Sequence, residues 1–244
     1  MKKNGIQCLQ RAFHRLRSTP LHPQWLAFIG VADTLLDVKH FSSGTIIDIG
    51  CGDRQPEREL DPHCVYIGMD LYQTATEWYD SKPDVYADAQ NLPFRDRTAD
   101  CVLLLDVLEH LPDPEKCISE VQRVLTPEGK VILQVPFLYP LHDVPLDFTR
   151  WTFYGLRRLT QDHGFDIVES KHIGKPVETA ALLLNIALTK SCVDWLRGWH
   201  PAAILVFLLP VLVVIINLAA RGMAKLSLED GFMPHAYRLV LQRI

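Results

Sequence analysis

One nine-residue segment constrains the fold of this chain more than any other. Residues 45–53 read Thr-Ile-Ile-Asp-Ile-Gly-Cys-Gly-Asp, so an apolar run that contains one acid ends in two glycines separated by a single residue. The run predicts a buried strand, and the glycines predict a tight turn, because glycine adopts positive φ and leaves room for a ligand. Asp48 lies near the carboxyl end of the strand, the usual position of ligands in open α/β sheets. The segment therefore indicates a site for a nucleotide-type cofactor.

The chain beyond this segment alternates between strand and helix patterns. Strands are expected at residues 45–49, 65–69, 85–87, 101–105, 130–135, 165–170 and 237–244. A helix is predicted over residues 114–125, because its apolar residues recur on one face and Asp113-Pro114 supplies an N-cap and a first-turn proline. Further helices are expected at residues 25–38 and 151–163. Apolar strands that alternate with helices indicate a mostly parallel sheet covered on both faces.

Charge and cysteine content narrow the range of partners. The net charge of the 244 residues is −4; residues 1–40 hold six Lys or Arg against two Asp, so they carry +4 and the remainder carries −8. A basic N-terminus on an acidic body argues against nucleic-acid binding by the body and permits contact with an anionic membrane surface. The six cysteines form no CxxC pair, so we expect reduced thiols on the cytoplasmic side and no metal site. The first apolar run is too short and too charged for a signal peptide.

Two apolar segments stand outside the strand pattern. Residues 201–220 contain no charge, and this run is long enough to cross a membrane. A single crossing would remove the last strand from the sheet, so two alternatives remain. In one, residues 180–188 and 201–220 form a helical hairpin that dips into one leaflet; in the other, they pack as a lid or a dimer face. Flanking basic residues and a basic amphipathic helix expected at residues 5–18 favour membrane association, although that helix can instead pack on the domain.

The acids that follow the first loop are more specific than the loop itself. The dinucleotide fingerprint G-x-G-x-x-G fails at Gln55, and Arg54 excludes a G-x-G-x-G version. However, an acid stands at or just after the end of each of the next three strands: Asp70, Asp88 and Asp106. An acid at the end of the second strand is suited to bind two ribose hydroxyls.

In order and spacing, these motifs resemble class I S-adenosylmethionine-dependent methyltransferases, of the methyltransferase type 11 group that includes quinone-biosynthesis enzymes. The resemblance spans about residues 45–170, with the last strand at 237–244. It implies an α/β, Rossmann-like sheet of seven strands with the last one antiparallel, and S-adenosyl-L-methionine as the cofactor. Arg54 departs from the family, which often has glycine there, and puts the course of the loop in doubt.

The resemblance also implies the cofactor contacts. The residues expected to bind the cofactor are Asp48, Gly50, Cys51, Gly52, Asp70, Leu71, Asp88, Ala89 and Asp106. The loop residues would hold the methionine end, Asp70 the ribose hydroxyls, and Asp88 the adenine amino group beside the next amide. Asp106 would lie near the sulfonium. The alternatives are that Asp70 only starts a helix, Asp88 only caps a turn and Asp106 is only an N-cap.

Residues 136–152 follow the fifth strand and are expected to meet the methyl acceptor. The candidate catalytic residues are His142, His110 and Asp143, and the candidate acceptor-binding residues are Arg150, Asp147 and Tyr139. A histidine can act as general base when an acid orients it, and Arg150 can bind an anionic group. The alternative for Arg150 is a structural ion pair with Asp147. Glu109 is expected to be a solvated helix residue.

The sequence thus predicts one methyltransferase core with helical additions. The expected parts are an N-terminal helical extension (1–40), the core (41–175), a hydrophobic helical insertion (176–225) and the final strand (226–244). The expected function is methyl transfer to a small or lipid-linked acceptor, by O-methylation, in a membrane-associated protein on the cytoplasmic side. The rival functions are a nicotinamide-dependent oxidoreductase and a catalytically silent, membrane-bound scaffold of the same fold.

Overall fold

The computed structural model describes residues 16–79, 81–228 and 231–244, which divide into two compact units. The sheet unit comprises Asp33–Ile173 and Ala236–Ile244, and the helical unit comprises the chain up to Ala32 and Gly174–His235. This division differs from the boundary expected after residue 40, because helix α2 (Trp25–Phe41) contributes to both units. The amphipathic helix expected at residues 5–18 lies mostly outside the described residues.

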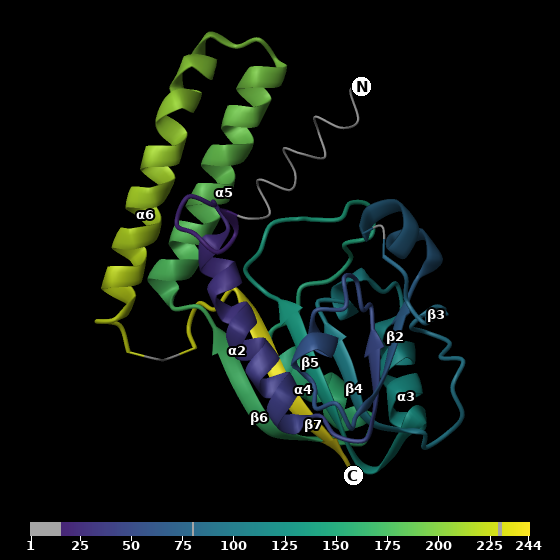
Figure 1. The fold of residues 1–244 in the computed structure, drawn as a ribbon. Coiled ribbons are helices and arrows are strands. Elements are labelled where there is room, and N and C mark those ends of the chain that lie inside the picture. The colour runs from purple at the N-terminus through teal and green to yellow at the C-terminus, as the bar shows by residue number, and fades with distance from the viewer. Residues whose placement is uncertain (1–15, 80, 229–230) are drawn as a thin grey trace. The chain divides into compact units, whose positions relative to one another are not determined.

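In the described residues, seven strands form one sheet in the order β3-β2-β1-β4-β5-β7-β6 (Figure 1). Their bounds are β1 Thr45–Ile49, β2 Val65–Asp70, β3 Val85–Tyr86, β4 Ala99–Leu105, β5 Leu125–Pro136, β6 Phe165–Ile173 and β7 Ala236–Arg243. Strands β1 to β5 pair in parallel, whereas β7 is antiparallel to both β5 and β6. The predicted Rossmann-like sheet with an antiparallel last strand is therefore confirmed. Strand order reverses between β1 and β4, and a crevice at such a point is where open α/β sheets bind ligands.

Alternating strand residues face two apolar clusters. Ile47 and Ile49 of β1 belong to the larger cluster, which also contains buried residues of α3 (Pro114–Val124) and α4 (Phe153–Asp162). Ile46 belongs to the smaller cluster, together with Val38 of α2. Both faces of the sheet are thus buried, as parallel sheets require. Helix α3 begins as expected, because the Asp113 side chain accepts a hydrogen bond from the Lys116 amide at 3.1 Å.

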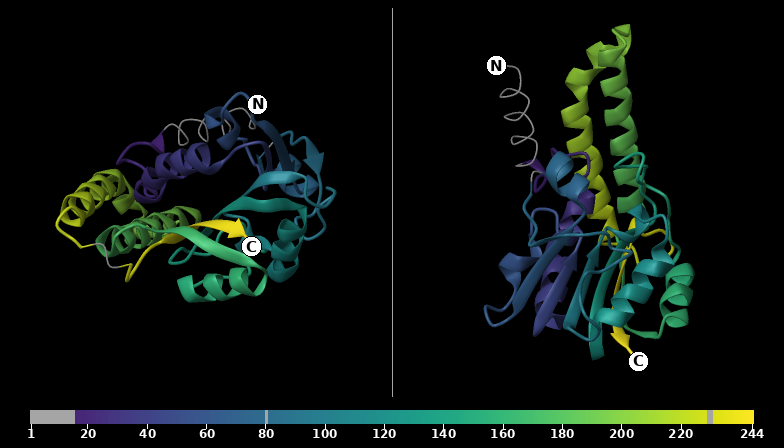
Figure 2. Two further views of the ribbon diagram at one scale, coloured as in Figure 1. Left: turned by 90° about the horizontal axis from the view of Figure 1, so that it is seen from below. Right: turned by 90° about the vertical axis from the view of Figure 1, so that its right-hand side faces the viewer.

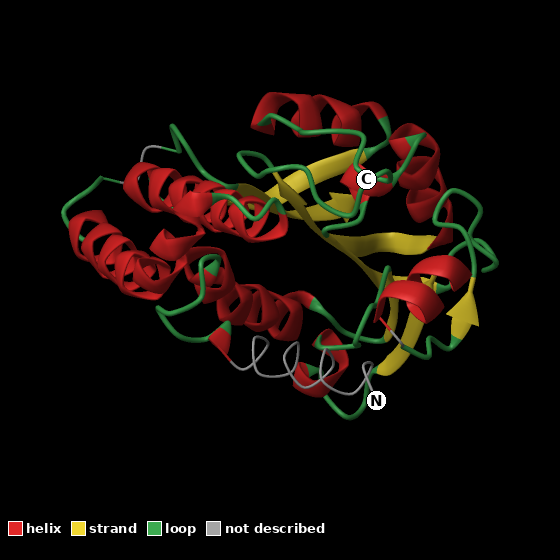
Figure 3. Cartoon of the chain, turned by 90° about the horizontal axis from the view of Figure 1, so that it is seen from above, coloured by secondary structure: helices red, strands yellow, loops and turns green. Residues whose placement is uncertain are grey.

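The helical unit contains a hairpin of two helices. Helix α5 (Pro176–Arg197) leads through the 3-10 helix η4 (Pro201–Leu208) into α6 (Leu209–Ala224), and α5 and α6 lie side by side (Figures 1, 2 and 3). Helix α5 is much longer than the apolar stretch expected at residues 180–188. Apolar composition reveals only part of this helix, because its two ends are polar.

Polar contacts join the two helices of the hairpin. The Asn185 side chain donates to Asn217 Oδ1 at 2.9 Å inside the interface, where both residues are buried. Glu178 pairs with Arg221 at 2.7 Å, and Lys175 Nζ donates to the carbonyl of Ala224 at 2.9 Å. The hairpin is therefore held at its middle by an amide pair and at its base by charged groups.

Two helical segments of the hairpin are long and apolar enough to cross a membrane. The segment Pro176–Arg197 has a mean hydropathy of 1.2, and Pro201–Ala224 has 2.9 with only 11% of its apolar window buried. Large apolar side chains of the second segment that are exposed include Ile204, Leu205, Phe207, Leu208, Val211, Leu212, Ile215, Leu218 and Met223. Core helices of soluble proteins can pass the same length and hydropathy test, but they bury most of their apolar side chains, which this segment does not.

Candidate functional site

A cavity lies at the carboxyl ends of β1, β2 and β4. It is lined by Ile49, Gly50, Met69, Asp70, Leu71, Thr74, Ala87, Asp88, Ala89, Asp106, Val107, His110, Leu111, Asp143 and Leu146. Its empty volume, counted with the open mouth, is about 700 Å³. The predicted residues that line it are Gly50, Asp70, Leu71, Asp88, Ala89, Asp106, His110 and Asp143. Those that do not are Asp48, Cys51, Gly52, His142, Asp147, Arg150 and Tyr139.

Gly50 and Gly52 both adopt the left-handed backbone conformation that the turn was expected to need, with φ of +73° and +48°. A Cβ at Gly50 would lie 2.4 Å from Val107 Cγ2, so no side chain fits there. The amides of Gly50 and Cys51 donate to the carbonyl of Met69 at 2.8 and 3.1 Å. These bonds draw the loop after β1 against the end of β2, where the cavity begins.

Asp70 joins this loop to the end of β2. Its carboxylate is 6% exposed and accepts hydrogen bonds from the amides of Gly52 (3.1 Å) and Leu71 (2.7 Å) and from the Thr74 hydroxyl (2.9 Å). Two backbone donors fix the orientation of a carboxylate. Asp70 therefore presents an oriented carboxylate at the cavity wall, as a residue that binds two hydroxyls would.

Arg54, the departure from the family pattern, takes over the conformation of a glycine. Its φ is +58°, in the left-handed region. Its guanidinium pairs with Glu57 at 2.8 Å and Asp84 at 2.9 Å, and lies over the Tyr66 ring with 5.0 Å to the centroid. The side chain thus braces the loop against the segment before β3. The loop turns tightly despite the arginine, because Arg54 itself adopts the left-handed conformation.

Asp48 lies beneath the loop rather than at the cavity wall. It is buried, and the Tyr66 hydroxyl donates to its Oδ2 at 2.6 Å. Burial raises the pKa of Asp48 to about 7, although the hydrogen bond from Tyr66 acts in the opposite direction. Any influence of Asp48 on a cofactor therefore passes through the loop above it.

Asp88 caps a turn and also lines the cavity. Its Oδ1 accepts a hydrogen bond from the Gln90 amide at 2.8 Å, so it caps the turn after β3. It also lines the cavity next to Ala89. A capped turn holds the carboxylate in place, which suits a residue that accepts a hydrogen bond from a ligand.

Asp106 follows β4 and is held by a polar residue of β5. Gln134 Nε2 donates to Asp106 Oδ2 at 3.0 Å, and Gln134 Oε1 accepts from the Thr34 hydroxyl at 2.9 Å. Asp106 is exposed to the cavity that it lines. The protein groups around its carboxyl, together with the nearby carboxylate of Glu109, raise the pKa of Asp106 above its usual range.

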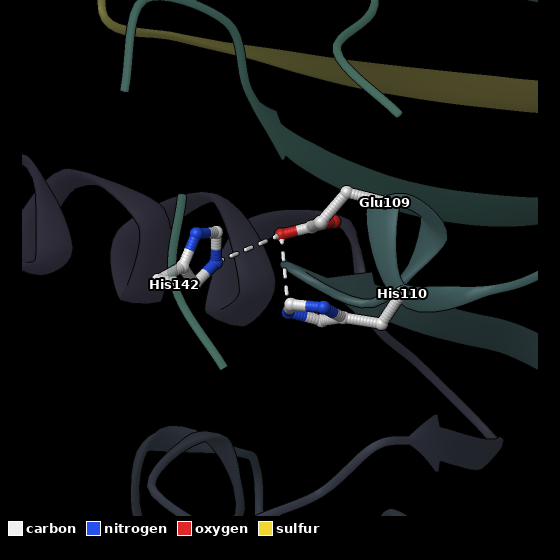
Figure 4. Close-up of side chains that lie close together, drawn as sticks. All are labelled: Glu109, His110 and His142. Carbon is white, nitrogen blue, oxygen red and sulfur yellow. Dashed lines mark ion pairs between the residues drawn. The ribbon is translucent and has the colours of Figure 1, made fainter. Parts of the chain in front are cut away.

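Glu109 is fully buried, so the expectation that it is a solvated helix residue was wrong. Its Oε1 lies 3.7 Å from His110 Nε2 and 3.8 Å from His142 Nε2 (Figure 4). Neither carboxylate oxygen has a hydrogen-bond partner among the described residues. The carboxylate raises the pKa of His142 above its ordinary value. The structure thereby brings the two candidate bases together, with ring centroids 4.9 Å apart, around an acid that the sequence did not single out.

Arg150 holds the loop after β5 through all five of its N–H groups. Nε donates to the carbonyl of Tyr139, Nη1 to Asp147 Oδ1 and to the carbonyl of Thr149, and Nη2 to Asp147 Oδ2 and to the carbonyl of Pro140. Burial acts to raise the pKa of Asp147, but the bonds from Arg150 and the His142 amide outweigh it and lower the pKa to about 2. The guanidinium has no donor left for an acceptor in this conformation, which favours the structural ion pair over acceptor binding.

Sequence reasoning missed three polar residues that position the site: Tyr66, Gln134 and Glu109. Tyr66 and Gln134 are polar groups inside otherwise apolar strands, which is a signal that a buried partner exists. Glu109 had a weaker signal, because an acid in a short segment after a strand is usually solvated. Its burial follows from the loop after β5, whose Phe148 amide donates to the Glu109 carbonyl at 2.9 Å.

The fold and the cavity define a class of protein. A parallel sheet with an antiparallel last strand, and an acid at the end of each strand around the switch point, is the arrangement of class I methyltransferases. Residues 47–133 match the family described as a methyltransferase domain. Over these residues the chain is a methyltransferase domain of the class I, S-adenosylmethionine-dependent kind, whose cofactor is S-adenosylmethionine.

Two curated relatives illustrate the match. The tRNA (carboxymethyluridine(34)-5-O)-methyltransferase of Arabidopsis thaliana is 34% identical over 116 residues, which cover 46% of this chain and 28% of that protein. The 27-O-demethylrifamycin SV methyltransferase of Amycolatopsis mediterranei is 34% identical over 107 residues, which cover 39% of each. This chain thus spans well under half the length of these relatives.

Solved structures share the fold. The [4+2]-cyclase SpnF has a TM-score of 0.55 at 17% identity, over 87% of this chain and 79% of that one. The phosphoethanolamine N-methyltransferase 2 of Haemonchus contortus, solved with phosphomonomethylethanolamine and S-adenosylhomocysteine, has a TM-score of 0.51 at 19% identity, over 87% of this chain and 52% of that one. At such identities the likeness shows the fold alone.

Proposed function

We propose that this protein transfers the methyl group of S-adenosylmethionine to an oxygen atom of a small or lipid-linked acceptor. The observation that carries the proposal is one cavity with two kinds of wall. Strand ends with oriented acids form one side, at Asp70 and Asp88, and His110 with Asp143 forms the other. Binding residues and proton-handling residues therefore face the same space.

The residues of the first wall fit the cofactor. In the proposed complex, the loop at Gly50 would lie against its methionine end, Asp70 would accept from both ribose hydroxyls, and Asp88 with the Ala89 amide would meet the adenine. When bound, S-adenosylmethionine supplies a methyl group already activated on a positively charged sulfur. The protein then contributes mainly alignment of the acceptor, which is worth up to roughly 7–11 kcal/mol.

The residues of the second wall favour an oxygen acceptor. A hydroxyl arrives protonated and needs a base, whereas a neutral amine does not. His110 lines the cavity, and His142 lies beside it on the same buried carboxylate. We expect His142→Ala to lower turnover on a hydroxyl acceptor by roughly 10²–10⁴-fold. The exposed His63→Ala is the matched control, and unchanged turnover in His142→Ala would remove the assignment.

Binding and turnover experiments separate the rival functions. Calorimetry with S-adenosylmethionine, S-adenosylhomocysteine and NAD is expected to give binding of the first two only; binding of NAD alone would overturn the proposal in favour of an oxidoreductase. Transfer of a radiolabelled methyl group is then measured into hydroxyl compounds, membrane lipid extract and total RNA. Label in the lipid or small-molecule arm supports the proposal. Label only in RNA would overturn the acceptor class, and label in no arm would favour the silent scaffold.

We infer that the hairpin places the protein on a membrane. The support is the exposed apolar surface of the segment Pro201–Ala224, whereas α5 carries an exposed Lys190–Asp194 ion pair towards its far end. Charges on α5 argue for shallow insertion rather than a full crossing. Membranes are extracted with carbonate, and the protein is expected in the pellet. The double variant Phe207→Asp/Ile215→Asp should shift it to the supernatant, and full release of the wild type without detergent would contradict insertion.

A further inference from the structure

We propose that Glu109, His110 and His142 bind a divalent metal ion of the zinc class at the acceptor side of the cavity. The sequence alone predicted no metal site, since its cysteines form no CxxC pair, and Glu109 was expected in solvent. The inference rests on the proposed function only for its consequence, activation of a hydroxyl acceptor. The binding itself is measurable without turnover.

The three side chains have the spacing of metal ligands. Glu109 Oε1 lies 3.7 Å from His110 Nε2 and 3.8 Å from His142 Nε2, and the ligand atoms all lie within 4.8 Å of one another (Figure 4). Two ligands that are each about 2.0–2.1 Å from a tetrahedral zinc ion are about 3.3 Å apart. Small side-chain movements therefore bring this set to bonding distance.

The burial of Glu109 favours a positive charge beside its carboxylate, which a protonated histidine or a metal ion can supply. Its side chain is fully buried, and both of its oxygens lack hydrogen-bond donors among the described residues. An ionised carboxylate in such a place is strongly unfavourable unless a positive charge compensates it. The only described side chains within ion-pair distance of it are the two histidines, whose Nε2 atoms face Oε1.

His110 is oriented as a metal ligand. Its Nδ1 lies 2.7 Å from the carbonyl oxygen of Leu146, which can only accept, so Nδ1 carries the proton. In the neutral ring Nε2 then presents a lone pair towards Glu109. A metal-bound histidine almost always donates its other ring N–H to a carbonyl or carboxylate in this way. A cation between the lone pair and the carboxylate turns a repulsive arrangement into an attractive one.

His142 is oriented in the same way. Its Nδ1 lies 3.3 Å from both the Pro140 carbonyl and Asp147 Oδ2, two acceptors. Arg150 Nη2 is 3.2 Å from the same nitrogen, but both of its protons are used by Pro140 and Asp147. The proton of the neutral ring therefore belongs on Nδ1, and Nε2 is free to bind a metal ion.

Ligand chemistry selects the metal and its consequence. Two imidazoles and one carboxylate suit zinc and other transition metals rather than calcium or magnesium. Three protein ligands leave a position open, as in catalytic zinc sites. His110 lines the cavity, and Asp143 Oδ2 lies 3.9 Å from its Nε2, so the open position faces the cavity. A cation there lowers the pKa of a hydroxyl bound to it, and Asp143, rather than a histidine bound to the metal ion, then takes the hydroxyl proton.

Cobalt titration of the chelator-treated full chain tests the inference. We expect one Co²⁺ per chain, with visible bands of nitrogen and oxygen ligands and no thiolate charge-transfer band, and displacement by Zn²⁺. Glu109→Gln keeps the shape of the side chain, and His142→Ala changes only the loop side; each is expected to weaken Co²⁺ binding at least about 10-fold. Affinity for S-adenosylhomocysteine, which reports an intact fold, should stay unchanged, and His63→Ala is the control.

The outcomes separate this inference from the proposed function. A wild-type chain that binds S-adenosylmethionine and transfers methyl but takes up no Co²⁺ or Zn²⁺ would overturn the metal site alone. Equal Co²⁺ binding in the wild type, Glu109→Gln and His142→Ala would also overturn it. Stoichiometric Co²⁺ binding that both variants lose, in a chain that transfers no methyl group, would support the metal site and overturn the proposed function.

Discussion

The two walls of the cavity are built by different means. The first wall, called here the cofactor wall, consists of strand ends with Asp70 and Asp88. Backbone groups hold its side chains in place, since the amides of Gly52 and Leu71 orient Asp70. The second wall, called here the acceptor wall, consists of the segment after β4 and the loop after β5, with His110 and Asp143. Side chains hold it in place, above all the ion pair Asp147–Arg150. The first wall follows from sheet topology, whereas the second depends on contacts between segments distant in sequence.

This difference separates the expected effects of substitution. Changes in the cofactor wall should alter affinity for S-adenosylmethionine, because they act on the residues that we propose to meet it. Changes in the acceptor wall should alter stability and turnover and leave that affinity unchanged. A substitution that breaks this division would show that the two walls are one cooperative structure.

The largest effect is expected for Asp70→Ala. The substitution would remove the carboxylate that accepts hydrogen bonds from the loop amides and, in the proposed complex, from the ribose hydroxyls. Hydrogen bonds to charged groups contribute about 1.5–3 kcal/mol each. Two such bonds predict an affinity for S-adenosylmethionine lower by roughly 10²–10⁴-fold, measured by calorimetry. Asp53→Ala, an exposed acid of the same loop, is the control and should bind within about threefold. Equal affinities would remove Asp70 from the cofactor wall.

Arg150→Ala tests the acceptor wall. It leaves Asp147, which is 1% exposed, without its ion-pair partner, and breaking a buried pair in this way costs about 3–5 kcal/mol. We expect a lower free energy of unfolding and lower turnover, with unchanged affinity for S-adenosylmethionine. The control is Arg158→Ala, which breaks an exposed pair with Asp162.

The opposite pattern would restore the acceptor-binding role of Arg150. An unchanged free energy of unfolding, together with a raised KM for an anionic acceptor only, requires a guanidinium that meets the acceptor. The five internal hydrogen bonds of Arg150 argue against this pattern.

The same division explains what the sequence could predict. Asp70 and Asp88 were identifiable because parallel strand ends share one edge of the sheet, so an acid at each end must approach the same crevice. Glu109 was not, because its burial depends on the loop at Phe148, some forty residues later. Arg54 was an anomaly by sequence, since a positive φ at a non-glycine residue cannot be inferred from the residue itself. Local sequence patterns therefore predict the strands and the acids at their ends. The contacts between side chains of distant segments can be identified only once the fold is known.

Asp48→Asn tests the layer beneath the cofactor wall through pH. Since the pKa of Asp48 is raised from 3.8 to about 7 in the folded protein, the folded state holds a proton that the unfolded state has lost between these values. The stabilisation of the folded state by protonated Asp48 is fully present below about pH 4, and it is lost as the pH rises through 7. The variant lacks this loss, so its free energy of unfolding relative to wild type should rise with pH, by up to about 4 kcal/mol.

Chemical unfolding of both proteins without cofactor, at pH 4.5, 6.0 and 7.5, measures this difference. The Asn side chain still accepts the Tyr66 hydrogen bond, so the comparison isolates the charge. A difference that is constant across these pH values would mean that Asp48 is ionised throughout, and that the loop above it tolerates a buried charge.

The smallest effect is expected for Arg54→Gly, where backbone and side chain act in opposite directions. Glycine relieves a left-handed conformation that costs a larger residue about 1–2 kcal/mol. It also removes ion pairs to half-exposed acids, worth about 0–1 kcal/mol each, and the contact with the Tyr66 ring, worth about 0.5–1 kcal/mol. The net change in unfolding free energy should lie within about 1 kcal/mol. Arg54→Ala loses the side chain but keeps the strain, so it should be less stable than the glycine variant by about 1 kcal/mol. If the glycine variant instead lost cofactor affinity by 100-fold, the brace formed by Arg54 would belong to the cofactor wall itself, and that wall would depend on side chains after all.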